Sequence, residues 1–379
     1  MTRVIFLHPA VRSYRFPLFV ELGRRGIHFL FTSINAPDTA AGKETDELLS
    51  HAPFVFYQAK EIVLGGKKNF SFDLWRVFKY DVIIFSGVTS IPFLLLAAPL
   101  YFLRKKVVVF DELWAYPQGK EYSYLRPLVR FLAKKMVRSF IPAGSKAAEF
   151  LNNEFNIPQD RLHVAYNTAP EPKPPTQHAD IDMRYLALVN KVKGLNRPVL
   201  LYLGRVVQYK GLDVLLQALA AMPNPPFLLV VGEGDYLTDC KKLTNILEIE
   251  NDVMFWGGCA SQDVSLFYSL ADLFVLPARR TKDDTIGYEA WGFTVNEAMW
   301  MRVPVLATNA VGAAYDLLLQ HRTGWICQEG SVESLALMLQ VTLKDKVELV
   351  SVGQRGYEWL KQRCSYSQNV RSIMSAVMK

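Results

Sequence analysis

Short apolar runs that alternate with longer amphipathic segments, twice over along the chain, are the feature that most limits its fold. In the first half we predict strands at residues 3–7, 27–32, 81–87, 106–111, 139–144 and 162–167. In the second half the matching runs are residues 198–204, 227–234, 252–258, 272–277, 303–308 and 324–328, with helices such as 211–222 and 261–270 between them. This alternation is typical of βα units wound around parallel sheets. The chain is therefore predicted to be an α/β protein with two Rossmann-like, doubly wound domains.

A proline-rich segment separates the two halves. The stretch NTAPEPKPPTQHAD, residues 167–180, contains four prolines, which disfavour both helix and sheet. We expect an N-terminal domain over residues 1–167, a linker over 168–180, a C-terminal domain over 181–363, and a last helix within 364–379 that crosses back to the first domain. Sheets of this kind bind ligands beyond the carboxyl ends of their strands. The default site is therefore a cleft across which the two domains face one another.

Composition narrows the class of protein. The chain has 379 residues, of which 50% are hydrophobic and 21% charged, which suits two globular domains. Its four cysteines stand far apart without a CxxC pair, so neither a zinc site nor a disulfide framework is indicated. The N-terminus resembles a first strand rather than a signal peptide, and the longest apolar run, IPFLLLAAPLYFL, falls short of the roughly 20 residues that span a bilayer. We expect a cytoplasmic protein.

The segment LGRVVQYKG suggests an anion site in the second half. Arg205 and Lys210 flank a loop that precedes a helix. A helix N-terminus with two cations suits a diphosphate. The alternative is a solvated loop that ends in a lysine.

The segment EAWGFTVNEAM places Glu289 and Glu297 eight positions apart around Gly292. Thr294 and Glu297 fit a capping box, which predicts a helix that begins at Thr294. Carboxylates are good acceptors for sugar hydroxyls, and a glycine lets the backbone approach a ligand closely. The alternative is that Glu297 only caps the helix and that Glu289 is exposed.

The order of these motifs along residues 199–340 resembles that of the retaining glycosyltransferases of family 4, which have the GT-B fold. The resemblance implies that Arg205 and Lys210 neutralise the diphosphate of a nucleotide-sugar donor. It also implies that Glu289 faces the donor sugar and that Glu297 holds the ribose hydroxyls.

The same resemblance implies a wider donor site. Backbone amides at Phe293 and Thr294, next to Gly292, would contact the phosphates, and Gly257 and Gly258 would line the pocket for the base. It implies no cofactor and no obligatory metal. The acidic pair DD at residues 283–284 is accordingly expected to lie in a solvated loop.

In the first half the resemblance is thinner, and it covers mainly residues 138–167. Arg12 and Arg15 follow the first predicted strand, where they could meet an acceptor or the donor phosphates; alternatively Arg15 pairs with Glu21. His8, directly after the same strand, is a candidate for a polar contact with the sugar or the acceptor, the alternative being a structural histidine. Asp111 ends another strand, and we expect it to make a polar contact with the sugar or the acceptor. In a retaining front-face displacement the leaving phosphate oxygen itself can accept the proton of the acceptor, so neither Asp111 nor its neighbour Glu112 need be a nucleophile.

The positive charge lies in the first half. Residues 1–185 hold 24 Lys and Arg against 17 Asp and Glu, whereas residues 186–379 hold 19 of each. Arg130, Lys134 and Arg138 are four residues apart and form a basic stripe if the segment is helical. Such a stripe favours peripheral contact with an anionic membrane at its inner face, the alternative being an ordinary solvated helix face. No motif for reading nucleic acid accompanies the charge.

The expected activity is therefore transfer of a hexose from a nucleoside diphosphate sugar, with retention, to a growing glycan or a lipid-linked acceptor in surface polysaccharide or glycoconjugate synthesis. Two alternatives remain open at this point. One is a GT-B epimerase that acts on the nucleotide sugar itself, and the other is a non-catalytic relative that binds sugars or tethers partners at a membrane.

Overall fold

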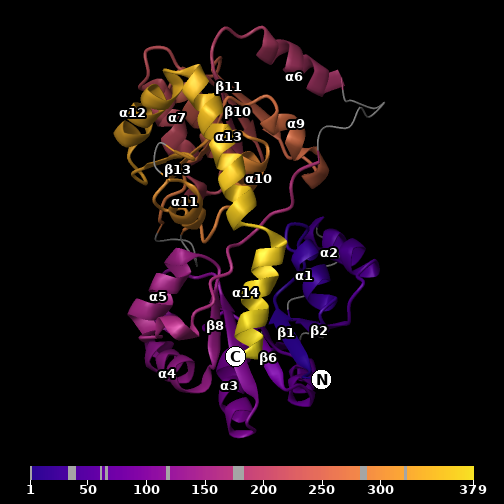
Figure 1. Cartoon of the computed structure of the whole chain (residues 1–379). Helices are drawn as coiled ribbons and strands as arrows, with labels where there is room; N and C mark the ends of the chain where they lie inside the picture. The colour runs from indigo at the N-terminus through magenta and orange to yellow at the C-terminus, as the bar shows by residue number, and fades with distance from the viewer. Residues whose placement is uncertain are drawn as a thin grey trace. The chain divides into compact units, whose positions relative to one another are not determined.

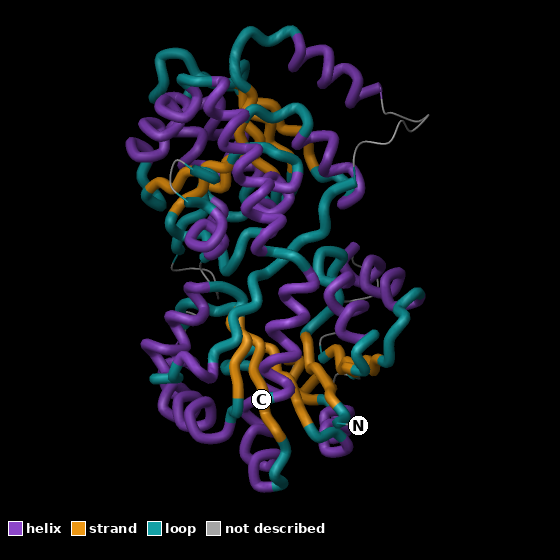
Figure 2. The backbone as a smooth tube through the Cα atoms, in the orientation of Figure 1, coloured by secondary structure: helices purple, strands orange, loops and turns teal. Residues whose placement is uncertain are grey.

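The computed structural model describes residues 2–32, 40–59, 62–64, 67–116, 120–173, 183–281, 288–319 and 322–379. The chain divides into two compact units, Met1–Thr168 with Cys364–Lys379, and Ala169–Arg363. Figure 1 shows the elements of each unit, and Figure 2 shows that strands form the middle of each unit while helices cover them. Residues 174–180, most of the proposed linker, lie outside the described part of the chain, as do residues 181 and 182.

The first unit is built on a parallel sheet with the strand order β3-β2-β1-β6-β7-β8. Its strands are β1 (Val4–His8), β2 (Ile27–Phe31), β3 (Phe56–Gln58), β6 (Val82–Ser86), β7 (Lys106–Asp111) and β8 (Ser139–Pro142). Its helices are α1 (Phe16–Gly23), α2 (Ala40–Ser50), α3 (Ile91–Phe102), α4 (Lys120–Met136), α5 (Ser145–Phe155) and α14 (Tyr366–Met378), with a 3₁₀ helix at Phe72–Lys79. A small antiparallel pair, β4 (Ile62–Leu64) and β5 (Lys67–Phe70), stands apart from the sheet.

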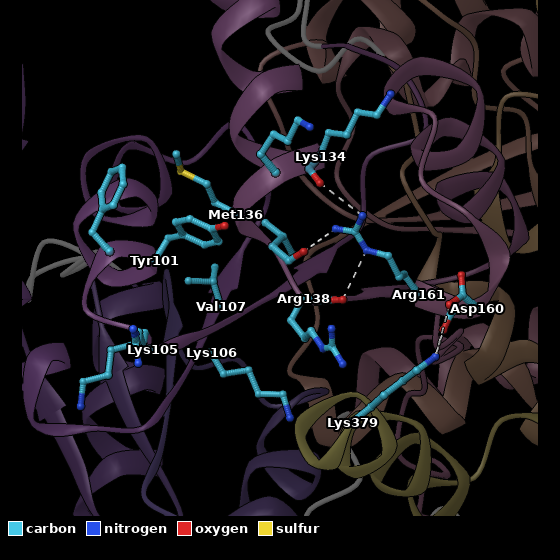
Figure 3. Close-up of a pocket in the computed structure, with 14 residues that line it drawn as sticks. Tyr101, Lys105, Lys106, Val107, Lys134, Met136, Arg138, Asp160, Arg161 and Lys379 are labelled. Carbon is cyan, nitrogen blue, oxygen red and sulfur yellow. Dashed lines mark hydrogen bonds and ion pairs between the residues drawn. The ribbon is translucent and has the colours of Figure 1, made fainter.

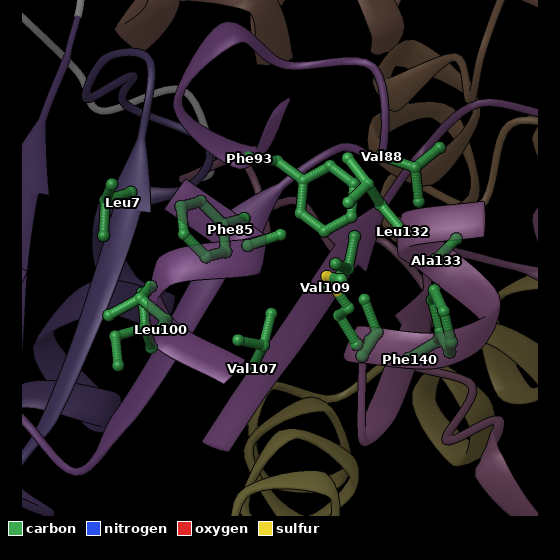
Figure 4. Close-up of a cluster of buried hydrophobic side chains, with 14 of the residues drawn as sticks. Leu7, Phe85, Val88, Phe93, Leu100, Val107, Val109, Leu132, Ala133 and Phe140 are labelled. Atoms are coloured by element: carbon green, nitrogen blue, oxygen red, sulfur yellow. The ribbon is translucent and has the colours of Figure 1, made fainter. Parts of the chain in front are cut away.

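Successive side chains of each strand point to opposite faces of this sheet, and both faces are buried. In β1, Phe6 joins the core under α1 and α14, whereas Leu7 joins the core under α3, α4 and α5. Figure 4 shows the second of these clusters, in which Phe93 of α3 and Leu132 of α4 pack on Val109 and other strand residues. Because neighbouring side chains of a strand point to opposite faces, both faces need helical cover, which explains the uninterrupted apolar strand sequences.

Helix α14 belongs to the first unit although it ends the chain. It begins with a capping box at Ser365, and it packs against α1 and β8. Ile373 is fully buried in the shared core, and Asn369 donates a hydrogen bond to the carbonyl of Tyr166 at 2.6 Å.

The second unit repeats the same topology, with the strand order β11-β10-β9-β12-β13-β14. Its strands are β9 (Val199–Leu203), β10 (Phe227–Val231), β11 (Val253–Gly257), β12 (Leu273–Leu276), β13 (Val305–Thr308) and β14 (Trp325–Cys327). Its helices are α6 (Met183–Lys193), α7 (Leu212–Ala220), α8 (Leu237–Ile246), α9 (Val264–Tyr268), α10 (Phe293–Trp300), α11 (Gly312–Leu317), α12 (Val332–Leu343) and α13 (Lys346–Arg363). Both sheets have the Rossmann order 3-2-1-4-5-6, and the predicted fold class is confirmed.

One predicted strand and three missed strands, β3, β4 and β5, mark where the sequence pattern was insufficient. Residues 162–167 form only an isolated bridge, at Leu162, although His163 and Ala165 donate backbone hydrogen bonds to the carbonyls of β8 residues. The segment therefore runs beside the sheet edge without becoming a full strand. Strand β3 was not predicted because it is only three residues long and only partly buried.

Candidate functional site

The carboxyl ends of β9 and β12, where the strand order of the second sheet reverses, are joined by a tight backbone contact. Gly211 has φ +70°, and a Cβ atom there would lie 2.0 Å from the carbonyl oxygen of Pro277. The backbone N–H of Arg279 donates to the carbonyl of Tyr209 at 2.8 Å. A glycine at position 211 therefore lets the loop that presents Lys210 pack against the chain leaving β12.

Lys210 forms an ion pair with Glu289 at this end of the sheet. The two side chains are only 12% and 14% exposed. The backbone of Glu289 bridges to the loop after β13, because its N–H donates to Ala310 and its carbonyl accepts from Gly312. The structure thus brings together two of the predicted site residues, which lie on separate loops.

Helix α10 begins one residue earlier than the capping box predicts. It starts at Phe293 with Gly292 as the N-cap, at φ +96°, and no side chain caps it. The capping-box prediction is therefore wrong: Thr294 lies inside the first turn, and its hydroxyl has no hydrogen-bond partner among the described residues. First-turn N–H groups cannot bond to a carbonyl four residues back within their own helix, so they can point to an anion.

Glu297 lies on α10 close to the lysine. The hydroxyl of Tyr268 lies 3.0 Å from its Oε2 and 3.1 Å from the carbonyl oxygen of Thr294, so these two acceptors share the single hydroxyl proton. Burial raises the pKa of Glu297 from 4.5 to about 7, although the hydrogen bond from Tyr268 and the charge of Lys210 act to lower it. Lys210 therefore interacts electrostatically with both predicted glutamates.

Arg205 lies at the exposed rim of the same strand end. Its Nη2 donates to the hydroxyl of Tyr209 at 2.8 Å, and its own carbonyl accepts from the hydroxyl of Tyr202. The guanidinium is thus positioned by an aromatic neighbour on the same loop and is accessible to a ligand.

The predicted base-pocket glycines lie at the carboxyl end of β11, where Gly257 is the last residue of the strand and Gly258 follows it. Gly257 has φ +95°, and the N–H of Gly258 donates to Oε1 of Glu233 at 3.2 Å. Sequence reasoning missed Glu233 and Tyr268 as neighbours of the site. The acidic residue in VVGEGD, directly after a buried strand, was a usable signal for Glu233, whereas no local pattern marks Tyr268.

His8, at the end of β1 in the first unit, is buried and neutral. Burial, together with the charge of Arg15, lowers its pKa to about 3. Its Nδ1 lies 2.9 Å from the carbonyl of Ala10. Because a carbonyl only accepts, Nδ1 carries the proton, and Nε2 of the neutral ring is an acceptor.

Arg15 lies beside His8 and pairs with Glu112, not with Glu21. The distance from its Nη2 to Oε1 of Glu112 is 2.6 Å, and Asn167 donates to the same oxygen at 2.5 Å. Burial acts to raise the pKa of Glu112, but the charge of Arg15 and the two hydrogen bonds outweigh it and hold that pKa below its usual value. The structure therefore adds Glu112 and Asn167 to this group.

Arg12 and Glu21 have other partners. Nη1 of Arg12 lies 3.8 Å from Oε2 of Glu44, and the Arg12 side chain is 30% exposed. Glu21 on α1 pairs with Arg24 and Arg25, which follow the helix, so the predicted alternative partner of Arg15 is already engaged.

Asp111 requires a correction. Its side chain is fully buried, and its two oxygens accept the backbone N–H groups of Val88 and Leu113, each at 2.9 Å. Burial raises its pKa to about 6. A carboxylate without exposed surface whose oxygens hold two loops has no room for a sugar, so the arrangement assigns Asp111 a structural role.

Among the described residues, no group of three or more His, Cys, Asp and Glu side chains is placed to hold a metal ion. The acidic pair at residues 283–284 lies outside the described part of the chain.

Known proteins resemble the second half of this chain in sequence. Residues 189–359 match the family model of the glycosyl transferases group 1. A GDP-mannose-dependent alpha-(1-6)-phosphatidylinositol monomannoside mannosyltransferase of Mycobacterium tuberculosis is 32% identical over 167 residues, which cover 43% of each chain. The capsular polysaccharide biosynthesis glycosyltransferase CapM of Staphylococcus aureus is 25% identical over 167 residues, which cover 43% of this chain and 41% of that protein. The chain thus matches less than half the length of these curated relatives.

A solved structure resembles the whole fold. The crystal structure of Anabaena Alr3699/HepE in complex with UDP has a TM-score of 0.75 at 16% identity, with 100% of both chains covered. This likeness concerns the fold, and it agrees with the two parallel six-stranded sheets described above. The chain has the GT-B fold, and its residues 189–359 have the sequence pattern of the group 1 glycosyl transferases.

Proposed function

We propose that this protein transfers a hexose from a nucleoside diphosphate sugar to a glycan or lipid-linked acceptor, with retention of configuration. The observation on which this proposal rests is the placement of Lys210 against Glu289 and near Glu297, at the strand ends of the unit that matches the group 1 family model. A cation beside two acceptor carboxylates suits a ligand that combines a diphosphate with sugar hydroxyls.

In the proposed reaction, the acceptor oxygen forms a bond to the anomeric carbon while the bond from that carbon to the donor phosphate oxygen breaks. The proton of the acceptor hydroxyl passes to the departing phosphate oxygen on the same face. Arg205 and Lys210 supply the positive charge that stabilises the leaving diphosphate, so the proposal requires no metal or cofactor. The N–H groups at Phe293 and Thr294 add contacts to the phosphates.

The two glutamates have separate roles in this proposal. Glu297 accepts hydrogen bonds from the ribose hydroxyls, and Glu289 turns from Lys210 toward the donor sugar when the diphosphate takes its place beside the lysine. Gly257 and Gly258 form the wall of the base pocket. Gly292 lets the diphosphate approach the start of α10.

The acceptor side of the proposal rests on the first unit. Arg12, Arg15 and His8 lie near the end of β1. We replace Asp111 in this group with Glu112, which pairs with Arg15, and with Asn167, which donates a hydrogen bond to Glu112. The names of the relatives support a glycan or lipid acceptor, since one acts on a phosphatidylinositol mannoside and another serves capsular polysaccharide synthesis. We place the enzyme in the cytoplasm, in peripheral contact with an anionic membrane and with no nucleic-acid partner.

A thermal-shift comparison of UDP, GDP, ADP and CMP tests the donor site. A nucleotide at 100 times its Kd stabilises the protein by about 2.7 kcal/mol, so one diphosphate should raise the Tm of the native protein clearly. Lys210→Ala should respond much less, and Lys242→Ala, which removes an exposed lysine of α8 (70% exposed), should respond like the native protein.

Product analysis then separates the alternatives. Acceptor-dependent release of a nucleoside diphosphate supports transfer, whereas an isomerised donor would support an epimerase instead. If no nucleotide stabilises the native protein, the donor-site proposal fails and a non-catalytic sugar-binding role takes its place.

A further inference from the structure

A basic cavity lies at the opposite end of the first sheet from the strand ends described above. It has a volume of about 890 Å³, and Figure 3 shows side chains that reach it from several elements. Lys106 begins β7 and Arg138 precedes β8, so the cavity lies at the amino ends of these strands. The cations that line it are Arg104, Lys105, Lys106, Lys134, Lys135, Arg138, Arg161 and Lys379, against one acidic residue, Asp160.

Most of this charge is not neutralised within the protein. Lys105 lies 3.8 Å from Asp81, and Lys379 lies 3.9 Å from Asp160. Lys106 donates a hydrogen bond to the carbonyl of Val377 at 2.7 Å. For Arg104, Lys134, Lys135 and Arg138, the described residues provide no ionic partner within 4 Å. Burial, and next the charge of Arg138, lowers the pKa of Lys106, as expected where cations crowd together.

The one arginine with an evident structural role is Arg161. Its guanidinium donates to the carbonyls of Ala133, Lys134, Val137 and Arg138, as Figure 3 shows in part. These contacts satisfy carbonyls at the carboxyl end of α4. Arg161 thus adds a third cation at the carboxyl end of α4, next to Lys134 and Lys135 in its last turn.

Arg104 adds a further cation to the wall of the cavity. It follows α3 at φ +55°, a left-handed conformation that favours glycine. An exposed arginine stands at this costly position and lines the cavity. Glu248 and Arg302, which also lie just after helices, have the same conformation, so the relevant feature of Arg104 is its place in the cavity wall.

The surface around the cavity is apolar and exposed. Phe102 and Leu103, at the end of α3, are 75% and 58% exposed, and Phe131 on the adjacent α4 is 54% exposed. Soluble surfaces seldom gather large apolar side chains beside dense charge unless the two meet a partner. The predicted basic stripe needs correction here: α4 ends at Met136, so Arg138 lies beyond the helix, and Arg130 pairs with Glu154 at 2.8 Å.

We infer that this cavity binds the phosphate-bearing headgroup of an anionic lipid, with the exposed side chains of α3 and α4 inserted into the surrounding leaflet. The dense cations match a phosphate, and the apolar rim matches a lipid interface better than a free anion. None of the helices that the structure describes could itself cross a bilayer. The inference rests on the proposed function only in its expectation of a membrane-borne acceptor, and it assigns the chain a second phosphate site, apart from the donor site.

Vesicle co-sedimentation of the full chain tests this inference. The native protein should bind phosphatidylcholine vesicles that contain phosphatidylglycerol and should not bind vesicles of phosphatidylcholine alone. Lys134→Gln with Arg138→Gln should weaken binding by about 10- to 30-fold. The matched control, Lys241→Gln with Lys242→Gln on α8, removes the same charge and should change binding by less than about twofold.

Two further variants separate misfolding from lost binding. Arg104→Gly removes a cation while it relieves the left-handed backbone, so it should weaken vesicle binding at unchanged or higher Tm. Phe102→Ser should weaken binding to vesicles but leave any response to pyrophosphate intact. Nucleotide-induced stabilisation should be unchanged in all these variants, so a failure here is distinct from a failure of the donor site.

Three results would overturn the inference. Equal losses in the α8 control and the cavity variant would mean general electrostatic attraction. Stabilisation by pyrophosphate that the cavity variant abolishes, without vesicle binding, would mean a site for soluble phosphates. Binding to neither vesicles nor pyrophosphate would mean an ordinary solvated basic surface.

Discussion

At the scale of single residues, Glu297 links the proposed donor site to stability. Its pKa is about 7 in the folded protein against 4.5 ordinarily, so the folded state holds a proton that the unfolded state releases between these values. Stability should therefore fall as pH rises from 4.5 to 7, by up to about 1.4 kcal/mol per pH unit from this group, and then level off. Glu297→Gln, which mimics the protonated form, should gain stability relative to the native protein over the same range.

Urea unfolding at pH 5, 6, 7 and 8 measures this difference. Because ribose hydroxyls donate hydrogen bonds, a bound nucleotide should favour the ionised carboxylate and flatten the decline in the native protein. Parallel pH curves for the variant and the native protein, with and without nucleotide, would show that Glu297 does not titrate as described.

Asp111 provides a second test at the same scale. In the native protein, both oxygens of Asp111 accept backbone N–H groups. Asp111→Asn replaces one of these oxygens with an NH₂ group, which cannot accept a hydrogen bond. One buried N–H therefore loses its partner, and the variant should lose about 1–3 kcal/mol of unfolding free energy. Asp160→Asn is the control, because its side chain is 72% exposed and the chemical change is the same. A stable Asp111→Asn protein without transfer activity would instead mean that Asp111 touches the substrate.

At the scale of elements, most strands could be predicted from the sequence because both faces of each sheet are buried, which makes the apolar runs of the strands nearly continuous.

The residues of the candidate site were harder to predict. Asp111 and Glu112 are neighbours at the same strand end, yet one is fully buried and the other pairs with Arg15. Only the course of the chain after β7 decides between them. Likewise Thr294 fits a capping pattern, but Gly292 begins the helix with a backbone conformation that no sequence motif specified.

Helix α14 is the element whose loss should matter most to the first unit. Ile373 is fully buried in the core that α14 shares with α1 and the sheet, so Ile373→Ala should destabilise this unit by about 2–5 kcal/mol. Met378→Ala on the same helix, where the side chain is 76% exposed, should have little effect. Hydrogen exchange in β1 and β6 measures the change, and unaltered exchange there would mean that α14 is dispensable to the core.

At the scale of the whole molecule, each unit has its own sheet and its own cores, and the proposed nucleotide contacts lie in one unit only. A ligand that binds only folded Ala169–Arg363 stabilises that unit against its own unfolding by about 2.7 kcal/mol at 100 times its Kd. Exchange of the most protected amides in β9, β10 and β12 should then slow by up to about 100-fold with the nucleoside diphosphate.

The same experiment should leave the most protected amides of β1, β6 and β7 unchanged, because the nucleotide makes no proposed contact with their unit. Lys210→Ala should abolish the slowing in the second unit, whereas Lys242→Ala should preserve it. Equal slowing in both units would contradict a site confined to the second unit. It would mean either that the two units unfold together or that residues of the first unit, such as Arg15, hold the diphosphate. The effect of Arg15→Gln on nucleotide affinity would distinguish these two explanations.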